Sequence, residues 1–494
     1  MVNFGIKSDI KTLKYINVGI LMDIPTATFV TGNRGETLIS GGIGSINGLV
    51  GIGDNFKSTI LHYLALTAAD KVFESKKDTQ IITYDTEMSA DPERLNSLAS
   101  KHPHLPKNLI YNEDKWTLIK KGSIPANEFI IKLHEYADNK NKDKNSIVEY
   151  EAFKSDDGKG VLKDLVPTFL EIDSLSAFES SATEELLTSG DIDGKETRTF
   201  AMNQGLFKTK FLTPLPVISN NNGIYMFLTG HLGEKIDMEV GPDKYNKSTD
   251  KKLPFLKSGD KIKGVPGNFF FLSNNIWLLH PASPLINKAT KLPEYPVSDQ
   301  DQNSIDLVTV KAQLVRGKHG GTNAMIDIVV SKSLGVLPSL TELHYIRSNK
   351  YYGLGGNNTT FHSVFLPDIN LTRTTVRAKL DQNEKLRRAI NITSELLQVT
   401  IFHTSMLNSL YGNDIICTPE ELYEDIKKLG YDWNELLDTR GYWLINQYNS
   451  EKHFLSIIDL LKMRKGLYEP YFLKKANKKW KRVKILRLLI WLKL

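Results

Sequence analysis

One stretch of eight residues limits the folds open to this chain more than any other feature. Residues 51–58 read Gly-Ile-Gly-Asp-Asn-Phe-Lys-Ser, after a glycine-rich, apolar segment at residues 41–50. Apolar residues then recur at a spacing near 3.6 through residues 57–73, which is typical of a helix. The stretch has the length and the ends of the phosphate-binding loop G-x-x-x-x-G-K-[ST], except that Phe56 replaces the second glycine. The pattern therefore predicts a loop that leads into a helix.

The residue types of this loop suit a bound nucleotide. Backbone N–H groups at the start of a helix can surround a β-phosphate, and Lys57 can neutralise the β- and γ-phosphate oxygens. The Ser58 hydroxyl can bind Mg²⁺. A glycine-rich turn before an ordinary helix with an exposed lysine has the same pattern, so the loop needs support from the rest of the chain.

Three further strand candidates carry polar residues at or just beyond their ends. Residues 80–85 precede Glu87, residues 168–173 end in Asp173, and residues 223–229 precede His231. In parallel α/β sheets, ligands bind at the carboxyl ends of the strands, so we expect these side chains to gather beside the loop. Taken singly, each acid would more often be a solvated loop carboxylate, and the histidine more often a satisfied structural residue.

The order of elements favours a mostly parallel α/β sheet flanked by helices, because strands alternate with helical stretches. Two long polar intervals, residues 179–198 and 233–267, interrupt it, and a Lys/Asn/Asp-rich stretch at 137–160 is expected to be a surface loop. The region after residue 350 looks mainly helical, with a helix start at Thr418. Further strands are expected at residues 275–279, 305–310 and 324–330.

Length and cysteine content restrict the class of protein. A chain of 494 residues exceeds the size at which single cores stop growing, so we expect more than one domain. The single cysteine, Cys417, cannot form an internal disulfide, which favours a reducing, cytoplasmic setting. Residues 1–20 show no secretory signal, and we expect no membrane span.

The net charge of +6 comes from one end of the chain. Residues 470–494 contain nine Lys or Arg and no acid, whereas the other 469 residues hold 54 basic and 57 acidic side chains. Bulk positive charge on the body therefore does not predict its partner. The basic tail fits three alternatives: an arm for nucleic acid or a partner, an interfacial membrane helix, or a helix that docks on the body.

Together these motifs resemble the RecA-type ATPases, and most closely the bacteriophage UvsX-like recombinases. In that branch the phosphate loop also carries Phe before Lys-Ser, as at Phe56. The order of motifs matches as well: the phosphate loop, Tyr-Asp-Thr-Glu at 84–87, Ile-Asp-Ser-Leu at 172–175, and a strand followed by a sensor histidine. The resemblance covers about residues 24–335, and it implies a phage origin, hence the cytoplasm of an infected cell.

The resemblance implies a role for each matching residue. Glu87 would activate water, Lys57 would stabilise the phosphates, and His231 would couple the γ-phosphate to the segment that follows it. Ser58 and Asp173 would hold Mg²⁺, while Arg316 and Lys318 would reach the ATP of an adjacent subunit. The remaining expected contacts to ATP are Gly51, Ile52, Gly53, Asp54, Asn55, Phe56 and Thr59.

The resemblance also implies a function and partners. The chain would form helical filaments on single-stranded DNA and promote homologous pairing and strand exchange in recombination and repair. DNA would contact residues 233–267, where eight lysines accompany six acids and two aromatics; the more acidic interval 179–198 and the tail are further candidate contacts. A mixed-charge surface loop has the same composition as residues 233–267. Single-strand-binding and mediator proteins are further expected partners.

The expected organisation has three parts. Residues 1–23 would form an N-terminal segment available for oligomerisation, residues 24–350 a RecA-like core, and residues 351–494 a mainly helical C-terminal region. Two other functions fit the same nucleotide site: a replicative-type DNA helicase with this fold, and a catalytically idle ATP- or DNA-binding mediator.

Overall fold

The structure is a computed structural model that describes most of the chain. The described ranges are residues 15–155, 158–181, 194–234, 260–287, 290–297 and 305–473. The expected DNA contacts therefore fall mainly outside the described residues, as residues 182–193, 235–259 and 474–494 do, and so does most of the N-terminal segment, residues 1–14.

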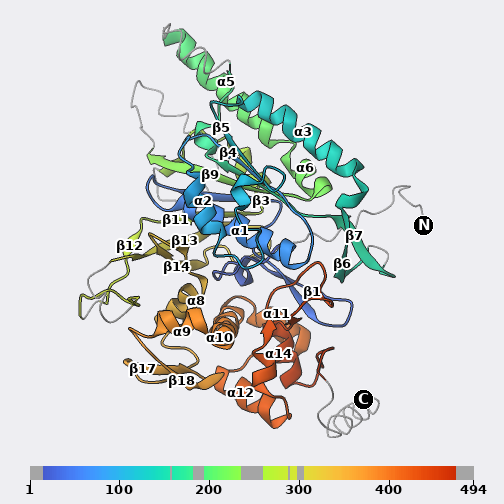
Figure 1. The fold of residues 1–494 in the computed structure, drawn as a ribbon, viewed down its shortest axis with the longest axis vertical. Helices are drawn as coiled ribbons and strands as arrows, with labels where there is room; N and C mark the ends of the chain where they lie inside the picture. The colour runs from blue at the N-terminus through green and yellow to red at the C-terminus, as the bar shows by residue number, and fades with distance from the viewer. Residues whose placement is uncertain are drawn as a thin grey trace, which may run out of the picture.

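The described chain forms a mixed α/β fold around a large, mostly parallel sheet with helices on both faces (Figure 1). Six parallel strands lie in the order β11-β3-β9-β8-β4-β5. Their bounds are β3 (Ile46–Gly51), β4 (Ile81–Asp85), β5 (Trp116–Lys120), β8 (Thr168–Asp173), β9 (Ile224–Glu234) and β11 (Asn275–Leu279). The prediction of a mostly parallel sheet is confirmed.

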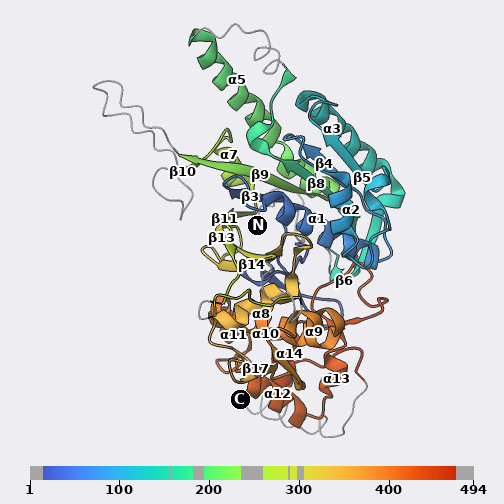
Figure 2. The same cartoon turned by 60° about the vertical axis from the view of Figure 1, so that its left-hand side comes forward.

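Antiparallel strands extend this sheet beyond β11. They are β13 (Leu307–Gly317), β14 (Met325–Ser331) and β15 (Gly335–Val336), while β12 (Ser283–Pro284) pairs with β13 and β10 (Asp260–Ile262) with β9. The β9–β10 pair projects from the sheet (Figure 2). The two long polar intervals are therefore not loops throughout, because β10 lies in the second and helix α5 begins in the first.

Along each strand, apolar side chains point alternately to the two faces of the sheet, and both faces are buried. Leu49 and Phe169 pack on one face with α1 (Lys57–Glu74) and α2 (Pro92–Ala99), while Val50 and Leu170 pack on the other. Helices α3 (Ala126–Lys142), α5 (Gly194–Leu212) and α6 (Leu215–Asn222) cover that second face, and the short α7 (Asn268–Leu272) follows β10 (Figure 2). Strands buried on both faces read as continuous apolar runs, which is why β8 and β11 match their predicted bounds.

The predicted surface loop at residues 137–160 is wrong. Helix α3 continues to Lys142, and residues 147–154 form β6 (Ile147–Lys154), which pairs with β7 (Val161–Leu165) outside the main sheet. The alternating burial of Val148, Tyr150 and Ala152 against the core stabilises this hairpin despite its polar composition. A second small ladder joins β1 (Thr28–Thr31) to β2 (Thr37–Ser40).

The region after residue 337 is built mostly from helices and lies at one end of the molecule (Figure 1). A three-stranded sheet, β16 (Leu354–Gly356), β17 (Thr360–Ser363) and β18 (Leu366–Thr372), and the pair β19 (Thr439–Arg440) and β20 (His453–Phe454) accompany them. The capping box predicted at Thr418 is present at α12. The helices are α8 (Pro338–Ser348), α9 (Val376–Gln382), α10 (Glu384–Phe402), α11 (Thr404–Tyr411), α12 (Pro419–Lys428), α13 (Trp433–Leu436) and α14 (Ile457–Arg464).

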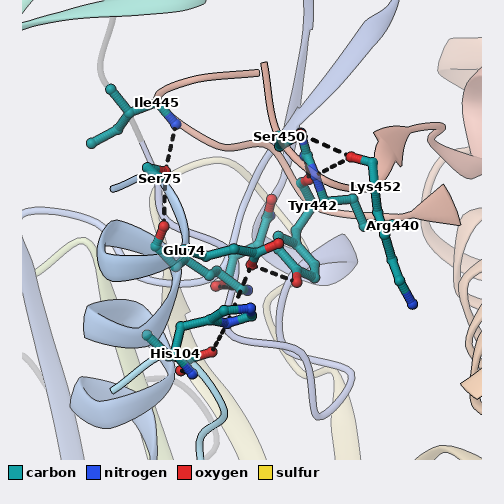
Figure 3. A network of polar contacts seen from close by, with 11 residues as sticks. Glu74, Ser75, His104, Arg440, Tyr442, Ile445, Ser450 and Lys452 are labelled. Carbon is teal, nitrogen blue, oxygen red and sulfur yellow. Dashed lines mark hydrogen bonds and ion pairs between the residues drawn. The ribbon is translucent and has the colours of Figure 1, made fainter. Parts of the chain in front are cut away.

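A polar network joins this region to the sheet domain at the end of α1 (Figure 3). The Tyr442 hydroxyl donates to Glu74 Oε2 at 2.8 Å, and the Ile445 amide donates to Ser75 Oγ at 3.1 Å. Nearby, the buried Arg440 guanidinium donates to the carbonyls of Tyr442, Gln447 and Lys452. Segments more than 360 residues apart in sequence are thus fixed together.

Two further findings bear on the expectations that the chain has no membrane span and forms no internal disulfide. Among the described helices, none combines the length and the apolarity needed to cross a membrane. Cys417 is a buried free thiol.

Candidate functional site

The carboxyl ends of the parallel strands meet at one end of the sheet, and the strand order predicts a ligand crevice there. From β3 the chain passes through α1 to β4 on one side, whereas the chain from β9 returns across β3 to β11 on the other. Such a reversal of direction opens a ligand crevice in α/β sheets. The candidate phosphate loop leaves β3 at this point, and Gly51 lies opposite His231 in the β3–β9 register.

The candidate phosphate loop is held against the end of β11. Asn55 is buried, and its side-chain amide donates to the carbonyls of Leu279 and His280 at 3.1 and 2.7 Å. Its Oδ1 accepts from the Ala282 amide at 2.7 Å. A side chain at Gly51 would place its Cβ 2.8 Å from the Leu279 carbonyl oxygen, which explains the glycine.

Phe56 takes the backbone conformation for which the usual glycine is suited. Its φ of 57° lies in the left-handed region, where side chains other than glycine are strained. The ring is partly buried against the core that α1 shares with the sheet. This packing offsets the strain, so the loop keeps its shape without the second glycine.

Lys57 begins α1 and turns back over the loop. It is buried, and its Nζ donates to the Ile52 carbonyl at 2.5 Å. Burial lowers the pKa of Lys57, while the carboxylates of Asp173, Glu87 and Asp54 oppose that shift. Lys57 stands at the first turn of α1, where backbone amides and the lysine ammonium can together bind an anionic ligand.

Ser58 and Asp173 form the centre of the crevice. Ser58 Oγ donates to Asp173 Oδ2 at 2.5 Å, and Thr229 Oγ1, on β9, donates to Asp173 Oδ1 at 2.5 Å. The carboxylate is thereby fixed at the end of β8 by one hydroxyl from the loop helix and one from the neighbouring strand. Thr229 was not singled out from the sequence, although it stands two residues before His231.

Glu87 and His231 meet at the open side of the crevice. Glu87 follows β4, and its Oε1 lies 2.6 Å from His231 Nε2. His231 lies within β9 rather than after it, because the strand extends past the apolar run to Glu234. Partial burial raises the pKa of Glu87, but the contact with His231 and the charge of Lys57 outweigh this and lower it, so Glu87 stays ionised at neutral pH.

A buried pair, His62 and Glu171, lies beneath the crevice and was not predicted from the sequence. Glu171 is fully buried on β8, and its carboxylate lies 3.0 Å from His62 Nδ1 on α1 and accepts from Thr83 Oγ1 at 2.6 Å. Burial alone would lower the pKa of His62, but the Glu171 charge and hydrogen bond raise it. The signal was present: His62 stands one helical turn after Ser58, and Glu171 stands two residues before Asp173 on the same side of its strand.

Two of the expected ATP contacts lie elsewhere. Arg316 and Lys318 stand at the end of β13, which runs antiparallel to β11 and pairs Gly317 with Asn275 at the amino end of that strand. Arg316 Nε donates to the Ser273 carbonyl at 3.2 Å. Both residues therefore lie at the amino ends of the parallel strands, whereas the phosphate loop of their own chain lies at the carboxyl ends.

The crevice has room and oxygen ligands for a hydrated cation. A cavity of about 140 Å³ lies beside Ser58 and Asp173, with Thr59, His62 and Asp85 also in its wall. Within the ranges that the structure describes, no group of three or more His, Cys, Asp or Glu side chains is arranged to hold a metal. Mg²⁺ usually keeps several waters and takes one or two protein oxygens together with substrate phosphates, so Ser58 and Asp173 fit it.

The geometry brings together Lys57, Ser58, Asp173, Glu87 and His231 from four separate elements. No protein-family model matches the chain, and no curated protein matches it significantly.

Proposed function

We propose that this chain is a RecA-type, UvsX-like ATPase that acts on single-stranded DNA. One observation carries the proposal: a phosphate-type loop and two carboxylates that follow separate parallel strands converge in one crevice, with Ser58 on Asp173 and Glu87 on His231. Residues 51–58, 85–87, 173 and 231 are distant in sequence, and a chance resemblance of motifs would not require them to meet.

The residues of the crevice have distinct roles in this proposal. When bound, Mg²⁺–ATP supplies the phosphoryl group for transfer to water. The amides at the start of α1 and the Lys57 ammonium bind the phosphates, and Ser58 and Asp173 hold the cation. The Glu87 carboxylate takes the proton of the attacking water. Because its pKa is lowered, this carboxylate is ionised at neutral pH and can accept that proton.

The same proposal assigns DNA to the side of the crevice where the β9–β10 pair projects. The lysine-bearing residues 235–259 connect these two strands, and His231 lies on β9 beside Glu87. In this proposal Arg316 and Lys318, which lie at the other end of the parallel strands, serve the ATP of a neighbouring subunit rather than their own. Such a contact is head-to-tail, because the two surfaces involved are different, and it generates a filament where the rotation between subunits does not close into a ring.

The first test is ATP hydrolysis with and without single-stranded DNA. We expect Mg²⁺-dependent turnover that rises with DNA, and losses of at least roughly 100-fold in Lys57→Ala and Glu87→Gln. Lys132→Ala, an exposed lysine on α3 away from the crevice, is the matched control and should keep wild-type turnover. Wild-type turnover in both Lys57→Ala and Glu87→Gln would refute the proposed site.

The second test separates the recombinase from its rivals. Electron microscopy with single-stranded DNA and a non-hydrolysable ATP analogue should show helical filaments, and a strand-exchange assay should show pairing. Closed hexameric rings would indicate a helicase instead. Tight ATP binding without any turnover would indicate an idle mediator.

A further inference from the structure

Lys208 is a charged side chain that the proposed chemistry does not use, yet it is buried almost completely. It lies on α5 with 1% of its surface exposed. Its Nζ donates to the carbonyl oxygens of Ser176 at 2.9 Å and Gly264 at 2.8 Å. Burying an ammonium group is costly, so a lysine held in this way implies that its two contacts matter.

The two carbonyls belong to separate turns beside the crevice. Ser176 lies in the short 3₁₀ turn Leu175–Ala177, which begins two residues after the end of β8 at Asp173. Gly264 lies in the turn after β10 and has a φ of +60°. A Cβ at Gly264 would stand 3.3 Å from Lys208 Nζ and 3.3 Å from the Ser176 carbonyl oxygen, so glycine permits this close approach.

A second set of hydrogen bonds connects the same two turns to His231. The His231 amide donates to Ser176 Oγ at 3.0 Å, and Ser176 Oγ donates to the Lys263 carbonyl at 3.0 Å. The Lys263 amide in turn donates to the His231 carbonyl at 2.8 Å. Since His231 also contacts Glu87 at 2.6 Å, an unbroken series of contacts runs from the proposed water-activating carboxylate to the end of β10.

The charge of Lys208 is adjusted by its surroundings. Burial lowers its pKa to about 8, the Glu179 carboxylate opposes that shift, and the Lys121 ammonium adds to it. Lys121 and Glu179 themselves form an ion pair at 3.1 Å. Near pH 7 Lys208 is therefore still mostly charged, and its hydrogen bonds to the two carbonyls are charge-assisted.

We propose that Lys208 and Ser176 are positioning residues that tie the turn after β8 to the turn after β10, so that the proposed ATP site and the β9–β10 hairpin change conformation together. The inference rests on the proposed function for the meaning of that coupling, but the tie itself is a property of the folded chain. Lys208 bonds to backbone carbonyls, and Ser176 reaches the crevice through the His231 backbone amide.

Hydrogen exchange tests the tie without any ligand. In Lys208→Met, which keeps the length of the side chain and removes its donors, the amides of His231 and Lys263 should exchange roughly tenfold faster than in the wild type. Ser176→Ala should do the same from the other side of the tie. Lys210→Met, an exposed lysine two residues along α5, is the matched control and should exchange like the wild type. Wild-type exchange at His231 and Lys263 in both Lys208→Met and Ser176→Ala would overturn the proposal.

ATP hydrolysis tests the consequence of the tie. We expect Lys208→Met and Ser176→Ala to keep DNA-free turnover within about twofold of the wild type and to lose most of the stimulation by single-stranded DNA. Full stimulation in both variants would overturn the coupling. If the wild-type protein hydrolyses no ATP, the proposed function fails, whereas the exchange experiment still decides whether Lys208 and Ser176 form the tie.

Discussion

At the scale of single residues, two carboxylates on β8 have different tasks. Asp173 stands at the end of the strand with a hydroxyl on each oxygen, from Ser58 and Thr229. Glu171, two residues earlier, is fully enclosed and faces His62. The first is available to a ligand, and the second fixes α1 on the sheet so that Ser58 reaches Asp173.

The His62–Glu171 pair predicts a pH-dependent contribution to stability. The pKa of His62 is raised in the folded state, so the pair stabilises the fold fully below the unfolded value near 6.5 and loses that effect as pH rises through the folded value. Glu171→Gln should therefore lower the free energy of unfolding by about 3 kcal/mol at pH 6 and by less at pH 9. Urea unfolding at both pH values measures this.

An exposed acid provides the control for that substitution. Glu149→Gln, on β6, removes a surface ion pair with Lys163 and should change stability by less than about 1 kcal/mol at either pH. An equal loss at pH 6 and pH 9 in Glu171→Gln would contradict the account of a charged histidine.

At the scale of elements, the phosphate loop depends on β11 as much as on β3. Asn55 makes three hydrogen bonds to residues 279–282, two as donor and one as acceptor. Asn55→Ala would leave these backbone groups without their partner and release the loop from the end of β11. We expect the affinity for ATP to fall roughly tenfold with little change in overall stability, as isothermal titration with a non-hydrolysable analogue would show.

A conservative change sharpens that experiment. Asn55→Asp keeps the acceptor for the Ala282 amide but cannot donate to the Leu279 and His280 carbonyls. It should therefore weaken binding as Asn55→Ala does. Wild-type affinity in both variants would show that the loop holds its shape without β11.

The elements also show what sequence can and cannot predict here. Strands buried on both faces, such as β8 and β11, were predicted at their observed bounds because an apolar run marks each from end to end. Strand β9 was predicted to end at Thr229 because its polar continuation through His231 is paired with β10, a partner that no local pattern reveals. Strand β6 was missed because lysines and asparagines surround its alternating apolar residues.

The residues of the candidate site also fall into those that sequence could predict and those that it could not. The motifs identified Lys57, Ser58, Glu87, Asp173 and His231 by spacing and order alone. Their partners depend on how distant strands align, so Thr229, and the Asn55 contacts to residues 279–282, became visible only in three dimensions. Lys208 carried no signal, because a lysine on a helix is ordinarily solvated.

At the scale of the whole molecule, buried charges gather where the sheet domain meets the C-terminal region. A cavity of about 670 Å³ lies between them, with Asp23, Lys71, Glu342, Arg388 and Glu395 among its lining. Burial raises the pKa of Glu342 to about 8, of Glu395 to about 7 and of Asp23 to about 6, although the basic neighbours oppose these shifts. The junction therefore holds protons near neutral pH that the unfolded chain would release.

The three carboxyls of this junction make a contribution to stability that falls as pH rises. Between about pH 5 and pH 8 they bind more protons in the folded state than in the unfolded state, so their contribution to the free energy of unfolding should decrease across that interval. Glu342→Gln should flatten the decrease by up to about 1.4 kcal/mol per pH unit, because it removes one of the titrating groups. Its amide oxygen can still accept from Asn391 Nδ2, as Glu342 Oε1 does at 2.8 Å. An unchanged pH slope in Glu342→Gln would contradict the assignment.

The most direct test of the central claim is single-turnover hydrolysis of Mg²⁺–ATP by the full chain on single-stranded DNA, with the wild type and Glu87→Gln compared side by side. The account predicts that both proteins bind ATP, that the wild type cleaves it, and that Glu87→Gln cleaves it at least roughly 100-fold more slowly. Equal cleavage rates in the two proteins, or binding without cleavage in the wild type, would contradict it.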